Sequence, residues 1–71
     1  MSDLIKINLL SMFTRELSDI EEDITNNQVW QRGSTSQEDF DLFAENLTEL
    51  KKYRNLLTKL KEQVEEGTFD V

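Results

Sequence analysis

Clustered carboxylates are the one feature of this chain that suggests chemistry at a site. The sequence contains no Cys and no His, so it has no thiolate nucleophile and no imidazole to move a proton or bind a metal near neutral pH. Without either residue no nucleophile–base pair can be assembled, and 71 residues are too few to enclose a pocket-sized core. We therefore expect no enzymatic activity, no cofactor and no metal ion.

The densest run of carboxylates lies between residues 18 and 23. On a helix these side chains scatter around the axis, and only Asp19 and Asp23, four residues apart, share a face. Carboxylate metal sites in helical bundles use Glu-x-x-His pairs, which a chain without His cannot supply. The run is therefore interpreted as a solvated helix face.

Residues 36 to 41 read Ser-Gln-Glu-Asp-Phe-Asp. Over these six residues the chain resembles the Ser-Gln-Glu-x-Asp signature of the small helical-hairpin aspartyl phosphatases that act on sporulation response regulators. The acids fall at Asp39 and Asp41, one residue to either side of the signature position, and one residue turns a side chain by about 100° around a helix. A helix N-cap explains the same letters, so the chain is not assigned to that family. A small regulator or phosphatase of a phosphorylated signalling domain remains the weakest functional alternative.

Two amphipathic stretches must position these residues. In the first, apolar residues recur at spacings of three and four, which is typical of a helix packed along one partner helix. They are Leu10, Phe13, Leu17, Ile20 and Ile24. Asn26 and Asn27 are poor helix formers, so this helix is expected to end near residue 29.

The second stretch has a strong start signal and a clear stop. Thr35 with Glu38 forms a capping box, Ser36 with Asp39 is a near match, and Gly67 is a candidate C-cap. Its predicted buried stripe is Phe40, Phe43, Leu47, Leu50, Tyr53, Leu57, Leu60 and Val64. One residue is missing from a strict heptad between Leu50 and Tyr53, which predicts a local overwinding.

These patterns predict an all-α fold with a single domain over residues 1–71. The domain is an antiparallel two-helix hairpin with a helix over about 3–29, a loop over about 30–36, a helix over about 37–66 and a short tail, 67–71.

Charge is segregated along the chain, whose net charge is −7. Residues 16 to 49 contain ten acidic residues against Arg32 alone, whereas residues 50 to 61 contain five basic residues and no acid. In a hairpin this predicts an acidic pole at the loop end and a more basic free end. The candidate acidic-pole residues are Asp19, Glu21, Glu22, Asp23, Asp39 and Asp41.

Apolar residues near the free end exceed what one partner helix can cover. Residues 4 to 13 carry apolar side chains almost all round the axis, and the second helix carries a wide apolar arc opposite them. We therefore expect a homodimer, a four-helix bundle in which two hairpins overlap in opposite orientations. The candidate self-association or partner interface is Leu4, Ile7, Met12, Tyr53, Leu56 and Leu60.

Two residues near the loop are candidate contact anchors. Trp30 lies off the seam, where it either plugs the loop end of the core or stands exposed as an interface anchor. Leu42 also points away from the buried stripe.

The sequence thus favours a non-enzymatic, acidic helical interaction module, an adaptor, assembly factor or inhibitor whose small size would suit a phage or mobile-element product. The alternative is an acidic DNA mimic that inhibits a nucleic-acid-binding protein. A net charge of −7 argues against direct binding to nucleic acid or to an anionic membrane. With no signal peptide and no spanning segment in the sequence, a cytoplasmic location is expected.

Overall fold

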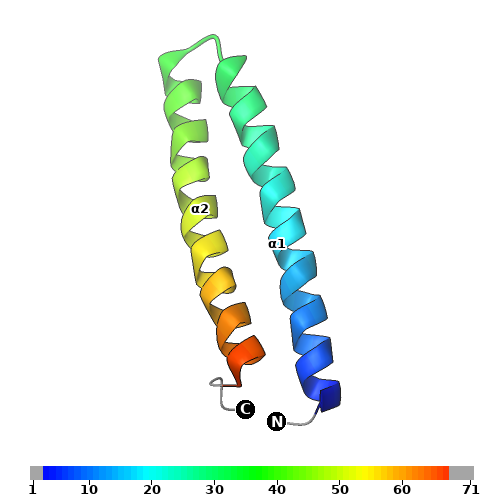
Figure 1. Cartoon of the computed structure of the whole chain (residues 1–71). Helices are drawn as coiled ribbons and strands as arrows, with labels where there is room; N and C mark the ends of the chain where they lie inside the picture. The colour runs from blue at the N-terminus through cyan, green and yellow to red at the C-terminus, as the bar shows by residue number, and fades with distance from the viewer. Residues whose placement is uncertain (1–2, 68–71) are drawn as a thin grey trace.

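The computed structural model describes residues 3–67 as two long helices joined by a short loop (Figure 1). Helix α1 spans Asp3–Arg32 and helix α2 spans Gln37–Glu66. The two helices run antiparallel, so that the start of α1 and the end of α2 lie at the same end of a rod measuring 51 × 16 × 13 Å (Figure 1). The predicted all-helical hairpin is confirmed, and no strand occurs within residues 3–67.

Helix α1 continues three residues beyond the predicted end at residue 29, so the loop is shorter than the predicted span of 30–36. The physical reason lies in Asn27, which is buried between the helices and donates a hydrogen bond from Nδ2 to the Asp23 carbonyl at 2.8 Å. This tertiary environment offsets the weak helix propensity of Asn. The helix closes where the Gly33 amide donates to the Val29 carbonyl at 3.1 Å and the Ser34 hydroxyl donates to the Trp30 carbonyl at 2.9 Å.

Helix α2 begins on the second of the two overlapping capping signals. Ser36 is the N-cap, with extended backbone (φ −125°, ψ 152°), and its hydroxyl accepts a hydrogen bond from the Asp39 amide at 3.1 Å. The helix ends at Gly67, whose φ of 76° is left-handed and whose amide donates back to the carbonyls of Gln63 and Val64. Both terminal signals were predicted. The rest of the predicted tail, residues 68–71, lies outside the described residues.

The core is formed by one continuous row of residues on each helix, the seam, whose members are spaced alternately three and four residues apart. Its buried apolar members are Phe13, Ile20, Ile24, Leu47, Leu57 and Val64, flanked by the partly buried Leu9, Leu10, Leu17, Leu50 and Leu60. On α2 the seam positions after Leu50 are Arg54, Leu57, Lys61 and Val64, so the heptad is unbroken.

The predicted buried stripe was therefore wrong at two positions on α2. Phe40 and Tyr53 remain 44% and 45% exposed, and the half-buried stems of Arg54 and Lys61 occupy seam positions instead. A long basic side chain can cover apolar surface with its methylene groups while its charged end stays in water. The sequence predicted one missing residue in the heptad between Leu50 and Tyr53 because Tyr53 was assigned to the seam in place of Arg54.

Within the described part of the chain, neither helix has a stretch long and apolar enough to cross a membrane.

Candidate interaction surface

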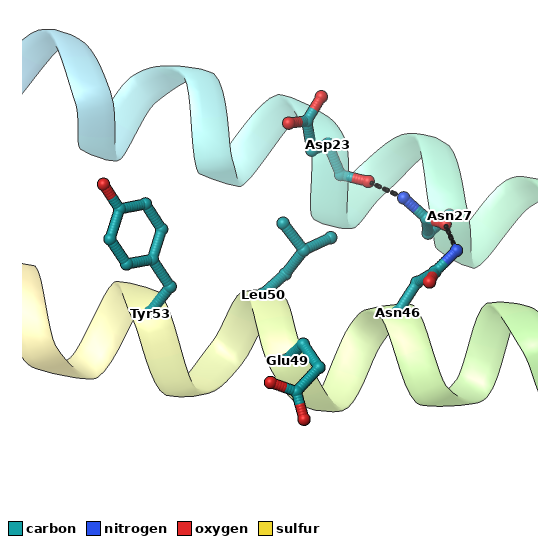
Figure 2. A pocket seen from close by; sticks show the side chains of 6 residues that line it. All are labelled: Asp23, Asn27, Asn46, Glu49, Leu50 and Tyr53. Atoms are coloured by element: carbon teal, nitrogen blue, oxygen red, sulfur yellow. Dashed lines mark hydrogen bonds between the residues drawn. The ribbon is translucent and has the colours of Figure 1, made fainter.

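A shallow groove between the helices runs along one side of the rod, from its middle toward the loop (Figure 2). Its lining comes from both helices: Asp23, Asn27, Asn46, Glu49, Leu50 and Tyr53. The side chains of Leu50 and Tyr53 point across the groove toward α1 (Figure 2). The groove is open to solvent, so it offers a surface for contact and no enclosed site for a small molecule.

A pair of asparagines closes the loop-side end of the groove. The buried Asn27 accepts a hydrogen bond at Oδ1 from Nδ2 of Asn46 at 3.3 Å, and donates its own amide to the Asp23 carbonyl (Figure 2). No buried side-chain nitrogen or oxygen within residues 3–67 lacks a partner. A polar residue at a single seam position commonly fixes the register of paired helices. Asn27 therefore ties α1 to α2 in one register.

The heptad repeat extends this side of the rod into a continuous surface, because residues seven apart on packed helices point in nearly the same direction. On α1, Asp23 has Leu9, Glu16 and Trp30 at multiples of seven. On α2, Glu49 has Leu42 and Leu56, and Tyr53 has Asn46 and Leu60. Ile5, Met12 and Asp19 form the neighbouring row of α1, next to this line. We call this whole surface the groove face.

The predicted interface residues divide between two sides of the molecule. Met12, Tyr53 and Leu56 lie on the groove face and are about half exposed. Leu60 lies at its edge and is partly buried against the core.

Leu4 and Ile7 lie off the groove face. Ile7 lines a shallow depression with Leu10, Ser11 and Thr14 that is bordered by residues of α1 alone, and Leu4 is one heptad before Ser11. The structure therefore does not bring all six predicted residues into one patch.

The two candidate anchors, Trp30 and Leu42, both reach the groove face at its loop end. Trp30 is 52% exposed, and its ring centroid lies 5.9 Å from that of Phe43 with the planes tilted by 48°. It covers Phe43 from outside and does not plug the core, so the plug interpretation is wrong. Leu42 is equally exposed and borders a surface depression formed with acidic residues of the first turns of α2.

The predicted acidic pole is two separate groups. Asp39 and Asp41 lie at the loop end, where Asp41 accepts a hydrogen bond from Gln37 Nε2 at 2.8 Å. Asp19, Glu21, Glu22 and Asp23 lie near mid-length of α1, and there Glu21 pairs with Arg54 of α2 at 3.0 Å. The basic segment of α2 thus stands beside the α1 carboxylates and not at the free end, because the last five residues of α2 follow it. These residues include Glu62, Glu65 and Glu66.

The opposite side of the rod is predominantly polar. It carries the Glu21–Arg54 pair, the Lys61–Glu65 pair at 3.9 Å, and a hydrogen bond from Lys6 Nζ to the Glu65 carbonyl at 3.3 Å. Three or more acidic side chains do not gather closely enough to hold a metal ion anywhere within residues 3–67.

Sequence reasoning missed Asn27 and Arg54 as seam residues. The signal was present in the spacing, since Asn27 continues the series from Ile20 and Ile24, and Arg54 continues that from Leu47 and Leu50. Both were left out because Asn and Arg are polar, and the prediction followed apolar residues only.

No family model matches the chain, and neither a curated protein nor a solved structure was found to match it.

Proposed function

We propose that this chain is a non-enzymatic helical interaction module that associates with itself and, as a dimer, serves a protein partner as an adaptor, assembly factor or inhibitor. The observation that carries the proposal is the uneven distribution of apolar surface. Ten large apolar side chains are exposed within residues 3–67, and six of them belong to the groove face. These six are Ile5, Met12, Trp30, Leu42, Tyr53 and Leu56. Exposed apolar side chains gathered on one side of a small protein support a site of protein association there.

The size of the core supports the same conclusion. Among the described residues 3–67, six apolar side chains are buried between the two helices, and only Val64 is fully inaccessible. Small domains of this length bury a low fraction of their surface and are stabilised by disulfides, metals or oligomerisation. The chain has no Cys and no His, so self-association is the remaining route. Covering the groove face adds stabilisation of roughly 25 cal/mol for each Å² of apolar surface removed from water.

The DNA-mimic alternative has less support. A mimic needs a continuous track of unpaired carboxylates, whereas Glu21 pairs with Arg54 and Glu49 pairs with Lys52. The phosphatase alternative depends on Asp39 or Asp41, and the Ser36–Asp39 contact is that of an ordinary helix cap.

Sedimentation equilibrium of the full chain tests the proposal. The wild-type chain is expected to sediment at twice its mass of 8.4 kDa. Leu56→Glu places a charge on the groove face without touching the core, and is expected to weaken dimerisation at least tenfold, because the charge must be desolvated in the interface.

Leu4→Glu is the matched control, because Leu4 is 70% exposed and lies off the groove face. It should keep the wild-type mass. A wild-type chain that sediments as a stable 8.4 kDa monomer contradicts the proposal, as does a Leu56→Glu variant with unchanged association.

A further inference from the structure

We propose that the loop end of the rod binds a basic, amphipathic helical segment of a partner protein. This inference rests on the proposed interaction function and names the class of partner and the surface that binds it. The surface lies beside the loop, where the end of α1 meets the first turns of α2 (Figure 1), and we call it the loop-end patch. It combines two exposed apolar side chains with four carboxylates: Trp30, Leu42, Glu38, Asp39, Asp41 and Glu45.

Two shallow depressions make the loop-end patch one continuous surface. Trp30 and Phe43 line the first, together with residues of the loop. Leu42 lines the second, and the other residues around it are the four carboxylates. Asp39 borders both depressions, so they adjoin. A ligand that lies across Asp39 therefore contacts both apolar side chains.

Polar residues separate the loop-end patch from the rest of the groove face. Asn27 contacts Asn46, so residues of α1 and α2 at the same height have numbers that add up to about 73. By this rule Leu42 lies at the height of Trp30, whereas Tyr53 lies about three helical turns away from them. The residues between these heights are the polar members of the groove lining: Asp23, Asn27, Asn46 and Glu49. The loop-end patch is thus an apolar surface distinct from that around Tyr53.

The four carboxylates of the loop-end patch have no basic partner. All four are exposed, and no Lys or Arg side chain within residues 3–67 forms an ion pair with any of them. Asp41 accepts a hydrogen bond from Gln37, which is neutral and leaves the charge uncompensated. Arg32 is the one basic residue between residues 29 and 45, and it borders neither depression. Residues 29–45 carry a net charge of −3 and attract a positively charged ligand.

The apolar and acidic side chains together define the chemistry of that ligand. Trp30 contacts Phe43 with its ring but remains half exposed. An indole ring binds apolar side chains and, through cation–π contacts, Lys and Arg as well. Leu42, which is equally exposed, adds apolar surface that a purely ionic ligand would not use. A helix with an apolar row flanked by Lys or Arg residues matches both parts of the patch.

A second copy of the chain offers no matching charge at either of its ends. Packing loop end on loop end brings together the four carboxylates of each copy. The free end, residues 3–12 and 61–66, carries four acidic residues against two basic ones. Like charges across an interface disfavour association. Charge therefore favours a different, basic polypeptide over a second copy at the loop-end patch.

Fluorescence of Trp30 tests the inference at the patch itself, because the sequence contains one Trp. The probe is a Trp-free peptide of about 14 residues, with Leu at helical spacings of three and four and Lys at the remaining positions. Saturable binding is expected to shift the Trp30 emission to shorter wavelength as the indole ring leaves water. The affinity should fall as salt rises, since salt screens the charges. The same peptide with Glu in place of each Lys should leave the emission unchanged.

A pair of leucine variants tests the apolar part of the patch. Leu42→Ala is expected to lower the affinity for the Lys peptide about tenfold, because an anchor side chain is lost from the contact. Leu56→Ala is the matched control, since Leu56 is equally exposed and lies two heptads further along the same side of α2. It should leave the affinity unchanged.

A pair of double variants tests the acidic part. Glu38→Gln with Glu45→Gln is expected to lower the affinity about fivefold, the effect of losing two exposed ion pairs. Glu62→Gln with Glu66→Gln makes the same change in net charge at the free end and should have little effect.

An unchanged Trp30 emission with the Lys peptide, or equal binding of the two peptides, overturns the inference. Equal losses of affinity in a patch variant and its control do so as well. A free chain whose Trp30 emission moves to longer wavelength on dilution has a second copy over the patch, which also overturns it. Sedimentation separates these results from the proposed self-association: a dimer that fails the peptide tests leaves self-association standing. A monomer that passes them contradicts self-association alone and supports the inference.

Discussion

The side-chain amide of Asn46 on α2 donates to the side-chain carbonyl of Asn27 on α1 across 3.3 Å, at a position where the surrounding seam is apolar. Asn27 is buried, whereas Asn46 is exposed, so the pair is half inside the core and half at the surface of the groove. Such a contact costs stability relative to a leucine in the seam but penalises any slipped register, because a slip leaves a buried amide without a partner.

Asn27→Leu is therefore expected to increase the free energy of unfolding by about 1 kcal/mol, since apolar burial replaces a desolvated amide and Asn46 can turn to water. Urea unfolding followed by helical circular dichroism at one fixed protein concentration measures this. Asn55→Leu, on an exposed side of α2, is the control and should change stability little. A less stable Asn27→Leu variant would show that the asparagine pair is itself a net stabilising contact.

Two valines in the chain provide a matched test of the core. Val64 is fully buried between the helices, whereas Val29 is 51% exposed near the loop. Val64→Ala is expected to cost about 2 kcal/mol, from the lost burial of two carbon atoms and the cavity that remains. Val29→Ala removes the same atoms and should cost less than about 0.5 kcal/mol. Equal effects on the unfolding midpoint would contradict the assignment of Val64 to the seam.

The helix cap distinguishes the two overlapping start signals of α2. Ser36→Ala is expected to lower stability by about 1 kcal/mol, because the Asp39 amide loses its acceptor. Thr35→Ala should change stability by less than about 0.5 kcal/mol. Thermal unfolding of the two variants beside the wild type checks this, and a larger loss for Thr35→Ala would move the start of α2 by one residue.

The hairpin could be predicted from the sequence because each local signal points the same way. The spacing of three and four residues from Leu10 to Ile24 specifies a helix, and Ser36 and Gly67 specify the two ends of α2. All of these signals act between residues that are close in the sequence. The end of α1 could not be predicted so well. Asn27 is a poor helix former in isolation, but it is buried against α2. This burial stabilises the helical conformation there, so α1 continues to Arg32.

The candidate surface was less predictable than the fold. Tyr53 continues an apolar stripe in the sequence, but the seam follows Arg54, whose methylene stem packs where no apolar residue stands. That one-residue shift moves Tyr53 onto the groove face. The distribution of charge was hard to predict for a related reason, because counting charge along the chain does not reveal that the basic segment of α2 lies at the height of Glu21.

The Glu21–Arg54 pair is expected to contribute little to stability despite its 3.0 Å separation, because both side chains are substantially exposed to water. A double-mutant cycle with Glu21→Gln and Arg54→Gln should give a coupling free energy of about 0.5 kcal/mol at low salt. In 1 M NaCl the coupling should largely disappear, since the screening length falls to about 3 Å. The Glu49–Lys52 pair, at 3.5 Å and more exposed still, is the internal comparison and should couple more weakly. A Glu21–Arg54 coupling that exceeds about 1.5 kcal/mol and persists in high salt would mean that water is excluded from the pair. The polar side of the rod would then also be covered in the assembled protein, and the groove face would no longer be the sole interface.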